Sequence, residues 1–322
     1  MRQLRIETKG NINNWLSYRY RQRLNRSNDS SGNIDNLPTS IDIAGIGVKL
    51  GKGFSIFAGK QCTAYGGIEF DLNPIEIYEY SDMIENMSNF MTGLNIGYDI
   101  NAHQQLNLQI LDSRNGSFNK TYGVETEDGE QPTIESGKLP LVYTLNWNGN
   151  FNDVFKTRWS ASIMNEAKDK NLYYFAFGNE LNLNKFNMFL DFMYSKEGID
   201  RKGIMTGITG SMEGHNAFDA GYFSMVTKLN YRFLPKWNAF VKGMYETASL
   251  TKQQGDLEKG KYRTAWGYFA GVEFYPMDTN LHFFLTYVGR SYDFTARAKA
   301  LGQENYSTNR VSVGFIYQLP MF

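Results

Sequence analysis

The sequence predicts an all-β protein, a transmembrane antiparallel β-barrel, and three observations support this. In residues 141–147, Leu, Tyr, Leu and Trp occupy every second position, with Val, Thr and Asn between them, and residues 187–194 and 311–319 alternate similarly. Side chains on a strand point to opposite faces in turn, so each segment has one apolar and one largely polar face. Aromatic residues make up 15% of the chain, with 21 Tyr and 23 Phe, which suits aromatic girdles at a water–lipid boundary. Mean hydropathy is -0.45, and the apolar runs fall short of the roughly 18–20 residues that a membrane helix needs.

The chain shows no composition break or linker that would divide its 322 residues, so we expect residues 1–322 to form a single barrel domain. Acidic and basic residues balance at 33 each, which gives no reason to expect a nucleic-acid partner. The lone Cys62 has no partner for a disulfide and is interpreted as structural. The first residues lack an apolar secretion signal, and we expect the N-terminus to be processed, truncated or misassigned.

Short connections alternate with longer polar ones along the chain, as periplasmic turns and extracellular loops do in outer-membrane barrels. The connections bound fifteen strands, from residues 2–8 to residues 310–319. Bacterial single-chain barrels have even strand counts, so we expect a barrel of sixteen strands whose first strand is missing. A barrel of that size encloses a water-filled lumen.

A soluble β-sandwich or solenoid would show the same alternation. The inward-facing positions, however, hold Gly, Ser, Asn, Thr and charged residues, which suit water better than a packed core. The barrel is therefore the preferred interpretation.

Residues 64–88 are expected to form the third extracellular loop and to fold into the lumen. Asn73, Pro74 and Glu76 have the pattern of a helix start, which predicts a short helix to about Met87. Its apolar positions could anchor one face to the wall: Ile77, Tyr80, Ile84 and Met87. The loop is interpreted as an acidic constriction element, and a solvated surface loop is the alternative. The acidic residues of this site are Glu69, Asp71, Glu76, Glu79 and Asp82.

A row of three arginines, Arg19, Arg21 and Arg23, shares one face of a predicted strand, with side chains about 7 Å apart. Three roles stay open for this row: a path for anions, a solvated rim, or pairing with the acidic loop. Lys60, Lys156 and Arg158 are further basic residues expected to line the pore.

A catalytic or metal site is not expected. His103, His215 and His282 are predicted on separate turns, loops and strands, and neither a Walker loop, a Gly-x-Ser-x-Gly elbow nor a paired-His zinc motif occurs. The loop carboxylates could bind a hard cation, but no EF-hand spacing supports this. We therefore expect no enzyme, no cofactor and no metal, while an acidic dyad among the outer loops stays an open alternative.

The stretches GKQ at residues 59–61, GIEF at 67–70 and YEYS at 78–81 resemble the phosphate-selective porin O and P family, particularly its Bacteroidetes-type members. The hairpin around Gly10 and residues 18–25 extend the resemblance over most of the chain. It implies a sixteen-stranded outer-membrane porin of a Gram-negative bacterium, commonly trimeric, that passes small solutes. The acidic third loop departs from an anion filter, and the arginine row does not match the family's anion-binding arginines residue by residue.

The expected function is passive diffusion of small hydrophilic solutes and ions. The alternatives are an anion- or phosphate-selective channel and a barrel that acts through its outer loops in adhesion or catalysis. Expected partners are outer-membrane lipid, a homotrimer, small solutes or inorganic anions, and the barrel assembly machinery. The C-terminal Phe322 would be the assembly signal, although Pro320 puts it out of phase with Phe315.

Overall fold

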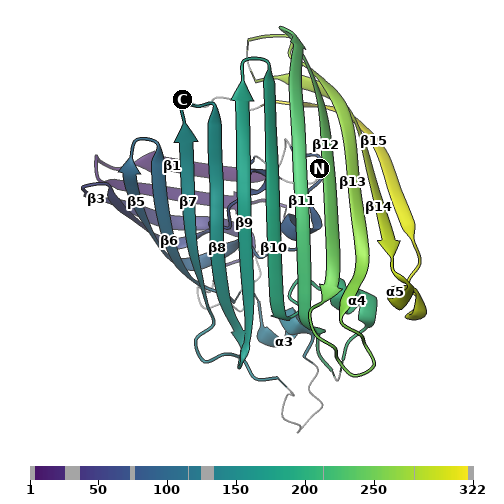
Figure 1. Cartoon of the computed structure of the whole chain (residues 1–322). Helices are drawn as coiled ribbons and strands as arrows, with labels where there is room; N and C mark the ends of the chain where they lie inside the picture. The colour runs from purple at the N-terminus through teal and green to yellow at the C-terminus, as the bar shows by residue number, and fades with distance from the viewer. Residues whose placement is uncertain are drawn as a thin grey trace.

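The computed structural model describes residues 4–25, 37–72, 77–114, 116–124, 134–212, 214–278 and 280–317, with Glu166 described by its backbone alone. The described residues form one sheet in which fifteen strands follow one another in chain order, each antiparallel to its neighbours (Figure 1). The strands are β1 (Arg5–Asn11), β2 (Leu16–Arg23), β3 (Ile41–Gly51), β4 (Phe54–Cys62), β5 (Phe90–Asn101), β6 (Gln104–Asp112), β7 (Leu141–Phe151), β8 (Phe155–Ala167), β9 (Lys170–Leu183), β10 (Phe186–Ile199), β11 (Phe218–Leu234), β12 (Trp237–Leu250), β13 (Gly260–Phe274), β14 (His282–Phe294) and β15 (Tyr306–Ile316). The helices are α1 (Ile68–Asp71), α2 (Asp82–Glu85), α3 (Phe118–Tyr122), α4 (Ile204–Thr209) and α5 (Ala296–Ala300).

The predicted antiparallel all-β fold is confirmed, but its ends differ in detail. The first strand begins at Arg5, and the last begins at Tyr306 instead of residue 310. Strands β1 and β15 are the two edges of the sheet and do not pair with each other in the described part of the chain. The sixteenth strand stays a prediction, and Phe322 lies outside the described residues.

Short turns lie at one end of the sheet and longer loops at the other, as the connection lengths predict, apart from the two-residue turn between β8 and β9 at the loop end. Helices α3, α4 and α5 all lie at the loop end, at the bottom of Figure 1. Asn152 and Asp153 form the turn between β7 and β8 with φ values of 55° and 57°, a conformation that Asn and Asp tolerate. The loop between β14 and β15 spans residues 295–305 and contains α5. Strand β11 has 17 residues, more than the roughly 9–11 that a membrane crossing needs, so it projects beyond the bilayer.

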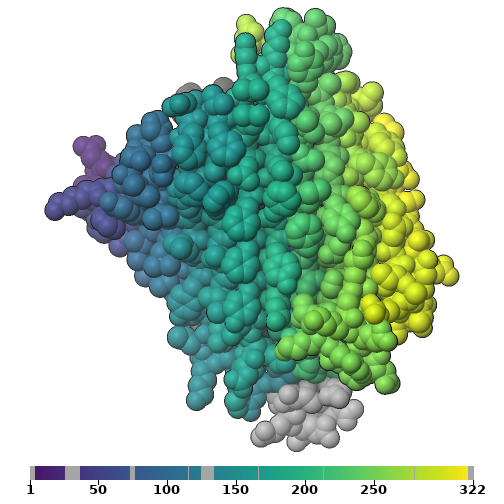
Figure 2. All heavy atoms as spheres, in the orientation of Figure 1, coloured from purple at the N-terminus to yellow at the C-terminus, as the bar shows by residue number. Residues whose placement is uncertain are grey.

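The outer face of the sheet is apolar and exposed, which confirms the alternation read from the sequence. Leu145 is 55% exposed and Val313 is 81% exposed, while the intervening Thr144 is buried. The outer faces of the central strands form one continuous surface (Figure 2). Apolar side chains facing outward fit hydrocarbon, because lipid replaces the core that a soluble sheet would require. In the described part of the chain, no helix is long and apolar enough to cross a membrane.

The inner face differs from the sequence interpretation, because it is not polar throughout. Leu111, Val142 and Met164 point inward and are at most 1% exposed. They belong to one apolar cluster with Tyr65 and Met83 from residues 64–88. A loop folded against the wall must bury its own apolar side chains, so the strands beneath it carry matching apolar residues.

Candidate functional site

Residues 64–88 pack against the inner face of the sheet, as predicted, and they do so through α1 and α2. The backbone N–H groups of Ile68 and Glu69 donate to the two carboxylate oxygens of Asp191 on β10, at 2.8 and 2.7 Å. The carboxylate thus accepts from the first turn of α1, where N–H groups lack helical partners. The backbone N–H of Gly67 donates to the carbonyl of Arg158 on β8 at 2.9 Å, so neighbouring strands fix the start of the loop.

A glycine on β9 makes this close approach possible. A Cβ on Gly178 would lie 2.7 Å from the Cα of Gly67 and 2.8 Å from the amide nitrogen of Ile68. Backbone atoms cannot yield as a flexible side chain would, so α1 requires glycine at this position of the wall.

Gly178→Val is therefore expected to push α1 into the lumen and change single-channel conductance in a planar bilayer. Gly243→Val is the matched control, because a Cβ at Gly243 meets only a side-chain methyl of Thr227 at 3.7 Å. Equal conductance of both variants and the parent would show that α1 is not held by contact with Gly178.

The predicted helix over residues 73–87 is wrong in its described part. Residues 77–81 are not helical, Tyr78 has a φ of 60°, and α2 begins only at Asp82. Asn73, Pro74 and Glu76 lie outside the described residues. Ile77 and Ile84 are buried, and Tyr80 and Met87 pack against the apolar cluster, so the predicted anchors do contact the interior without sharing one helix.

Contacts of Glu69 explain why residues 77–81 are not helical, because its side chain binds this segment on the interior side. Its carboxylate is fully buried and accepts hydrogen bonds from the backbone N–H and the hydroxyl of Ser81. Lys242 on β12 donates its ammonium to the same carboxylate and to the carbonyl of Glu79. These tertiary bonds keep residues 79–81 out of a helix, with Ser81 extended, against the helical tendency of their sequence.

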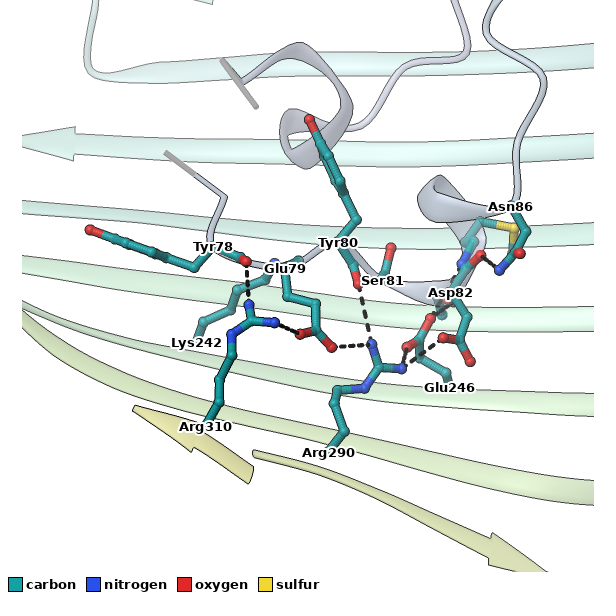
Figure 3. A network of polar contacts seen from close by, with 12 residues as sticks. Tyr78, Glu79, Tyr80, Ser81, Asp82, Asn86, Lys242, Glu246, Arg290 and Arg310 are labelled. Carbon is teal, nitrogen blue, oxygen red and sulfur yellow. Dashed lines mark hydrogen bonds and ion pairs between the residues drawn. The ribbon is translucent and has the colours of Figure 1, made fainter. Parts of the chain in front are cut away.

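A second set of ion pairs holds Glu79 and Asp82 (Figure 3). Arg290 on β14 donates to Asp82 at 2.8 Å and to Glu246 of β12 at 2.8 Å, and lies 3.6 Å from Glu79. Arg310 on β15 lies 3.0 Å from Glu79, and Arg263 on β13 pairs with Asp82. Buried opposite charges in contact compensate one another, so the loop carboxylates bind the wall.

The aromatic ring of Tyr78 lies against the wall beside these ion pairs. It stacks on Phe240 with 5.0 Å between ring centroids and meets Phe284 edge-on at 5.1 Å. Its hydroxyl donates to Glu273 at 2.8 Å, and Arg310 donates to its backbone carbonyl at 2.6 Å. Apolar, hydrogen-bonding and ionic contacts therefore all dock the same short segment.

The arginine row lies on β2, away from these contacts. Arg19 pairs with Glu7 at 2.8 Å, and Arg23 pairs with Asp42 of β3 at 2.9 Å. Arg21 lies 3.6 Å from Asp42. Among the described residues the row pairs with Glu7 and Asp42 and makes no ion pair with the acidic loop, while Glu76 of that loop lies outside the described residues.

The structure adds a fourth arginine to this row. Arg5 on β1 lies opposite Arg23 in the strand register and 3.6 Å from Asp42. The signal was present in the sequence, because Arg5, Glu7 and Lys9 alternate in the first segment. Arg263 and Arg310 were also missed as loop contacts, although each falls in phase with the polar face of its strand.

The other predicted basic residues do not form one cluster. Lys156 lies 3.8 Å from Glu180, and Arg158 pairs with Asp71 of α1 at 2.8 Å. Lys60 is buried in the cross-strand row of Ala44 and Thr92, one residue out of phase with the row that contains Arg19. Its place in the pore lining stays a prediction.

Comparison with known proteins places this geometry in context. The family model of phosphate-selective porin O and P matches residues 1–319. No curated protein matches the chain. The outer-membrane channel DcaP of Acinetobacter baumannii has a TM-score of 0.60 at 10% identity, over 97% of this chain and 83% of that one. Salmonella typhi OmpF, solved with daunomycin, has 0.55 at 14% identity, over 98% and 89%. The trimer form of Vibrio cholerae OmpT has 0.54 at 11% identity, over 91% and 80%.

At sequence identities of 10–14%, the solved channels establish the fold alone. The match to the family model establishes membership of the family. The family is one of porins, and DcaP is described as an outer-membrane channel, so this chain is assigned to the outer membrane of a Gram-negative bacterium as a channel for passive diffusion. The loop docked on the inner wall and the apolar outer face agree with that assignment. The chain belongs to the phosphate-selective porin O and P family.

Proposed function

We propose that the chain is a general diffusion porin in which residues 64–88 form the narrow part of the lumen. The proposal rests on one observation: each ion pair described for this loop joins it to a strand between β8 and β15. The pairs are Asp71 with Arg158, Glu69 with Lys242, Glu79 with Arg290 and Arg310, and Asp82 with Arg263 and Arg290. These contacts hold the described parts of the loop to one side of the wall, and we infer that the open path for solutes lies on the side of β1 to β4.

The charge balance supports weak selectivity. Wall cations compensate four carboxylates of the loop, those of Glu69, Asp71, Glu79 and Asp82, which weakens the loop as an acidic filter. On the open side, Arg5, Arg19, Arg21 and Arg23 face Glu7 and Asp42, which leaves a basic excess. Such an excess favours anions modestly, because water in a wide lumen screens the charges.

An anion- or phosphate-selective channel is the second candidate, and the same basic excess favours it. The position of Asp42 argues against strong anion selectivity. Its carboxylate lies within 3.6 Å of Arg5, Arg21 and Arg23 and partly compensates their charges. A bound anion would compete with that carboxylate for the guanidinium groups. We infer that passage involves no catalysis, because the described parts of the chain place His103, His215 and His282 on separate elements.

Assembly follows from the same proposal. One of the solved channels, OmpT of Vibrio cholerae, is described in a trimer form. We infer a homotrimer embedded in outer-membrane lipid, with the apolar outer face toward hydrocarbon and neighbouring copies. Recognition of Phe322 by the barrel assembly machinery is part of the proposal and concerns a residue beyond the described range.

Single-channel conductance and reversal potential under a KCl gradient test the proposal. Large, ohmic and weakly selective steps are expected from the folded full-length chain. Small steps with strong anion preference and block by phosphate would favour the second candidate. No conductance from a verified barrel would contradict both.

The combined variant Arg19→Ala, Arg21→Ala, Arg23→Ala is expected to shift the reversal potential toward cation preference, because Glu7 and Asp42 lose their nearest compensating charges. The matched control replaces the same three residues with lysine, which keeps the charge and should keep the parent's reversal potential. An unchanged reversal potential in the alanine variant would remove the row from the conduction path.

A further inference from the structure

The inner face of β5, β6 and β7 carries a row of side-chain amides with little charge among them. Asn95, Gln105, Asn107, Asn146 and Asn148 occupy inward positions of these three strands. Within these fully described strands, Asp99 is the one charged residue on that face. A solute crossing the lumen therefore meets neutral donors and acceptors on this side.

The amides bond to one another in a chain that runs along the wall. Gln105 donates to Asp99 at 2.8 Å, Asn107 donates to Gln105 at 3.1 Å, and Asn95 donates to Asn107 at 3.2 Å. Asn107 also lies 3.3 Å from the side-chain oxygen of Asn146. Mutual hydrogen bonds orient each amide, so the row presents a fixed pattern instead of freely rotating groups.

At the turn end of the lumen the row opens into a hollow of about 380 Å³. That volume falls within the range of small-molecule sites. Its polar lining includes Asp99, His103, Gln105, Asn148, Asn150 and Arg158. The side-chain oxygen of Asn148 is buried and has no hydrogen-bond partner among the described residues. A buried acceptor without a partner is costly, so a donor supplied by a solute would stabilise it once the side chain turns into the hollow.

The chemistry of this lining selects among solutes. An amide donates and accepts, and so does a hydroxyl group, so a solute with several hydroxyls can exchange its bonds to water for bonds to this wall. An anion finds Arg158 already paired with Asp71 at 2.8 Å and meets the carboxylate of Asp99. A cation finds Asp99 already accepting from Gln105 and meets the guanidinium of Arg158. The hollow thus holds a carboxylate and a guanidinium together, so an ion of either sign meets a like charge.

We propose that this hollow is a binding site for uncharged polyhydroxylated solutes, that is saccharides, on the turn side of the constriction loop. The site rests on the proposed porin function and adds a solute class to it. Arg158 links the two regions, because it lines the hollow and pairs with α1 of the loop. A saccharide that has passed the loop meets the amides next.

The test records single channels of the full-length chain in a planar bilayer with KCl and adds maltotriose to each side in turn. Entry of maltotriose into the hollow is expected to interrupt the ion current, with an interruption frequency that saturates as concentration rises. Asn148→Ala is expected to shorten each interruption about fivefold, the effect of losing one net neutral hydrogen bond. Asn230→Ala is the matched control, because Asn230 bonds to Asn187 on the opposite wall and does not line the hollow.

The outcomes separate the site from the porin function. Ohmic conductance without interruptions, or interruptions of equal duration in Asn148→Ala and the parent, would overturn the saccharide site and leave the porin intact. Interruptions by gluconate or glucosamine as long as those by maltotriose would overturn the uncharged class. Absence of conductance would overturn both proposals. Heat-dependent migration on a gel verifies that each variant is a folded barrel before recording.

Discussion

Arg290→Met is expected to release residues 79–82 from the barrel wall and to give larger, noisier single-channel currents. The Arg290 side chain is 3% exposed, and it contacts Asp82, Glu246 and Glu79 at once. Removing one partner of a buried ion pair costs about 3–5 kcal/mol, because the remaining charge stays buried without compensation. Glu246 is the carboxylate left without a cation, while Asp82 retains Arg263 and Glu79 retains Arg310. Undocking of the segment lets water reach Glu246, and a widened lumen follows.

Two further variants test the cause of that result. Arg297→Met removes a guanidinium whose pair with Glu258 is exposed, and it should leave the currents unchanged. Adding Glu246→Leu to Arg290→Met replaces both buried partners, and Arg263 still holds Asp82, so it should restore much of the parent's behaviour. Parental currents in Arg290→Met alone would show that the loop is not held by these ion pairs.

Lys242→Met is expected to make Tyr78 and Tyr80 accessible to chymotrypsin in an otherwise intact barrel. Lys242 compensates Glu69, whose side chain is fully buried, and it also binds the carbonyl of Glu79. Loss of the ammonium leaves an unpaired buried carboxylate, at a cost again of about 3–5 kcal/mol. Ser81 alone cannot compensate that charge, so the clamp on residues 79–81 should open.

Mass spectrometry of the cleaved fragments measures this effect. Lys156→Met is the matched control, since Lys156 and Glu180 are 3.8 Å apart and both partly exposed, and it should not increase cleavage. Combining Lys242→Met with Glu69→Gln removes the unpaired charge and should restore protection. If chymotrypsin does not cleave the loop in Lys242→Met, then Lys242 is not what holds residues 79–81 on the wall.

The fold could be predicted from the sequence because a membrane barrel simplifies the pattern. Lipid outside and water or polar contacts inside enforce alternation, so Leu145 and Thr144 could be assigned to opposite faces from neighbouring letters alone. The turns and loops followed from connection length. The strand ends were less certain because strands such as β11 continue beyond the bilayer, where the alternation no longer depends on lipid.

The candidate site could be predicted only in part. The acidic loop and its place inside the barrel followed from the sequence, but of the helix predicted over residues 73–87 only Asp82–Glu85 is helical in the described part. A local pattern at Asn73 and Pro74 could not reveal that Lys242, about 170 residues away along the chain, would pair with Glu69 and hold Ser81 extended. The amide-lined hollow was missed for a similar reason, since it depends on the register of β5, β6 and β7.

The described ion pairs hold residues 64–88 on strands β8 to β15. The effect of a substitution on the loop should therefore depend on which strand carries it. Strands β8 to β15 hold the loop, so a change at Lys242 or Arg290 disturbs the shape of the passage. Strands β1 to β4 make none of its described ion pairs. Substitutions at Arg19 or Arg21 can therefore alter which solutes pass without altering how the loop is held.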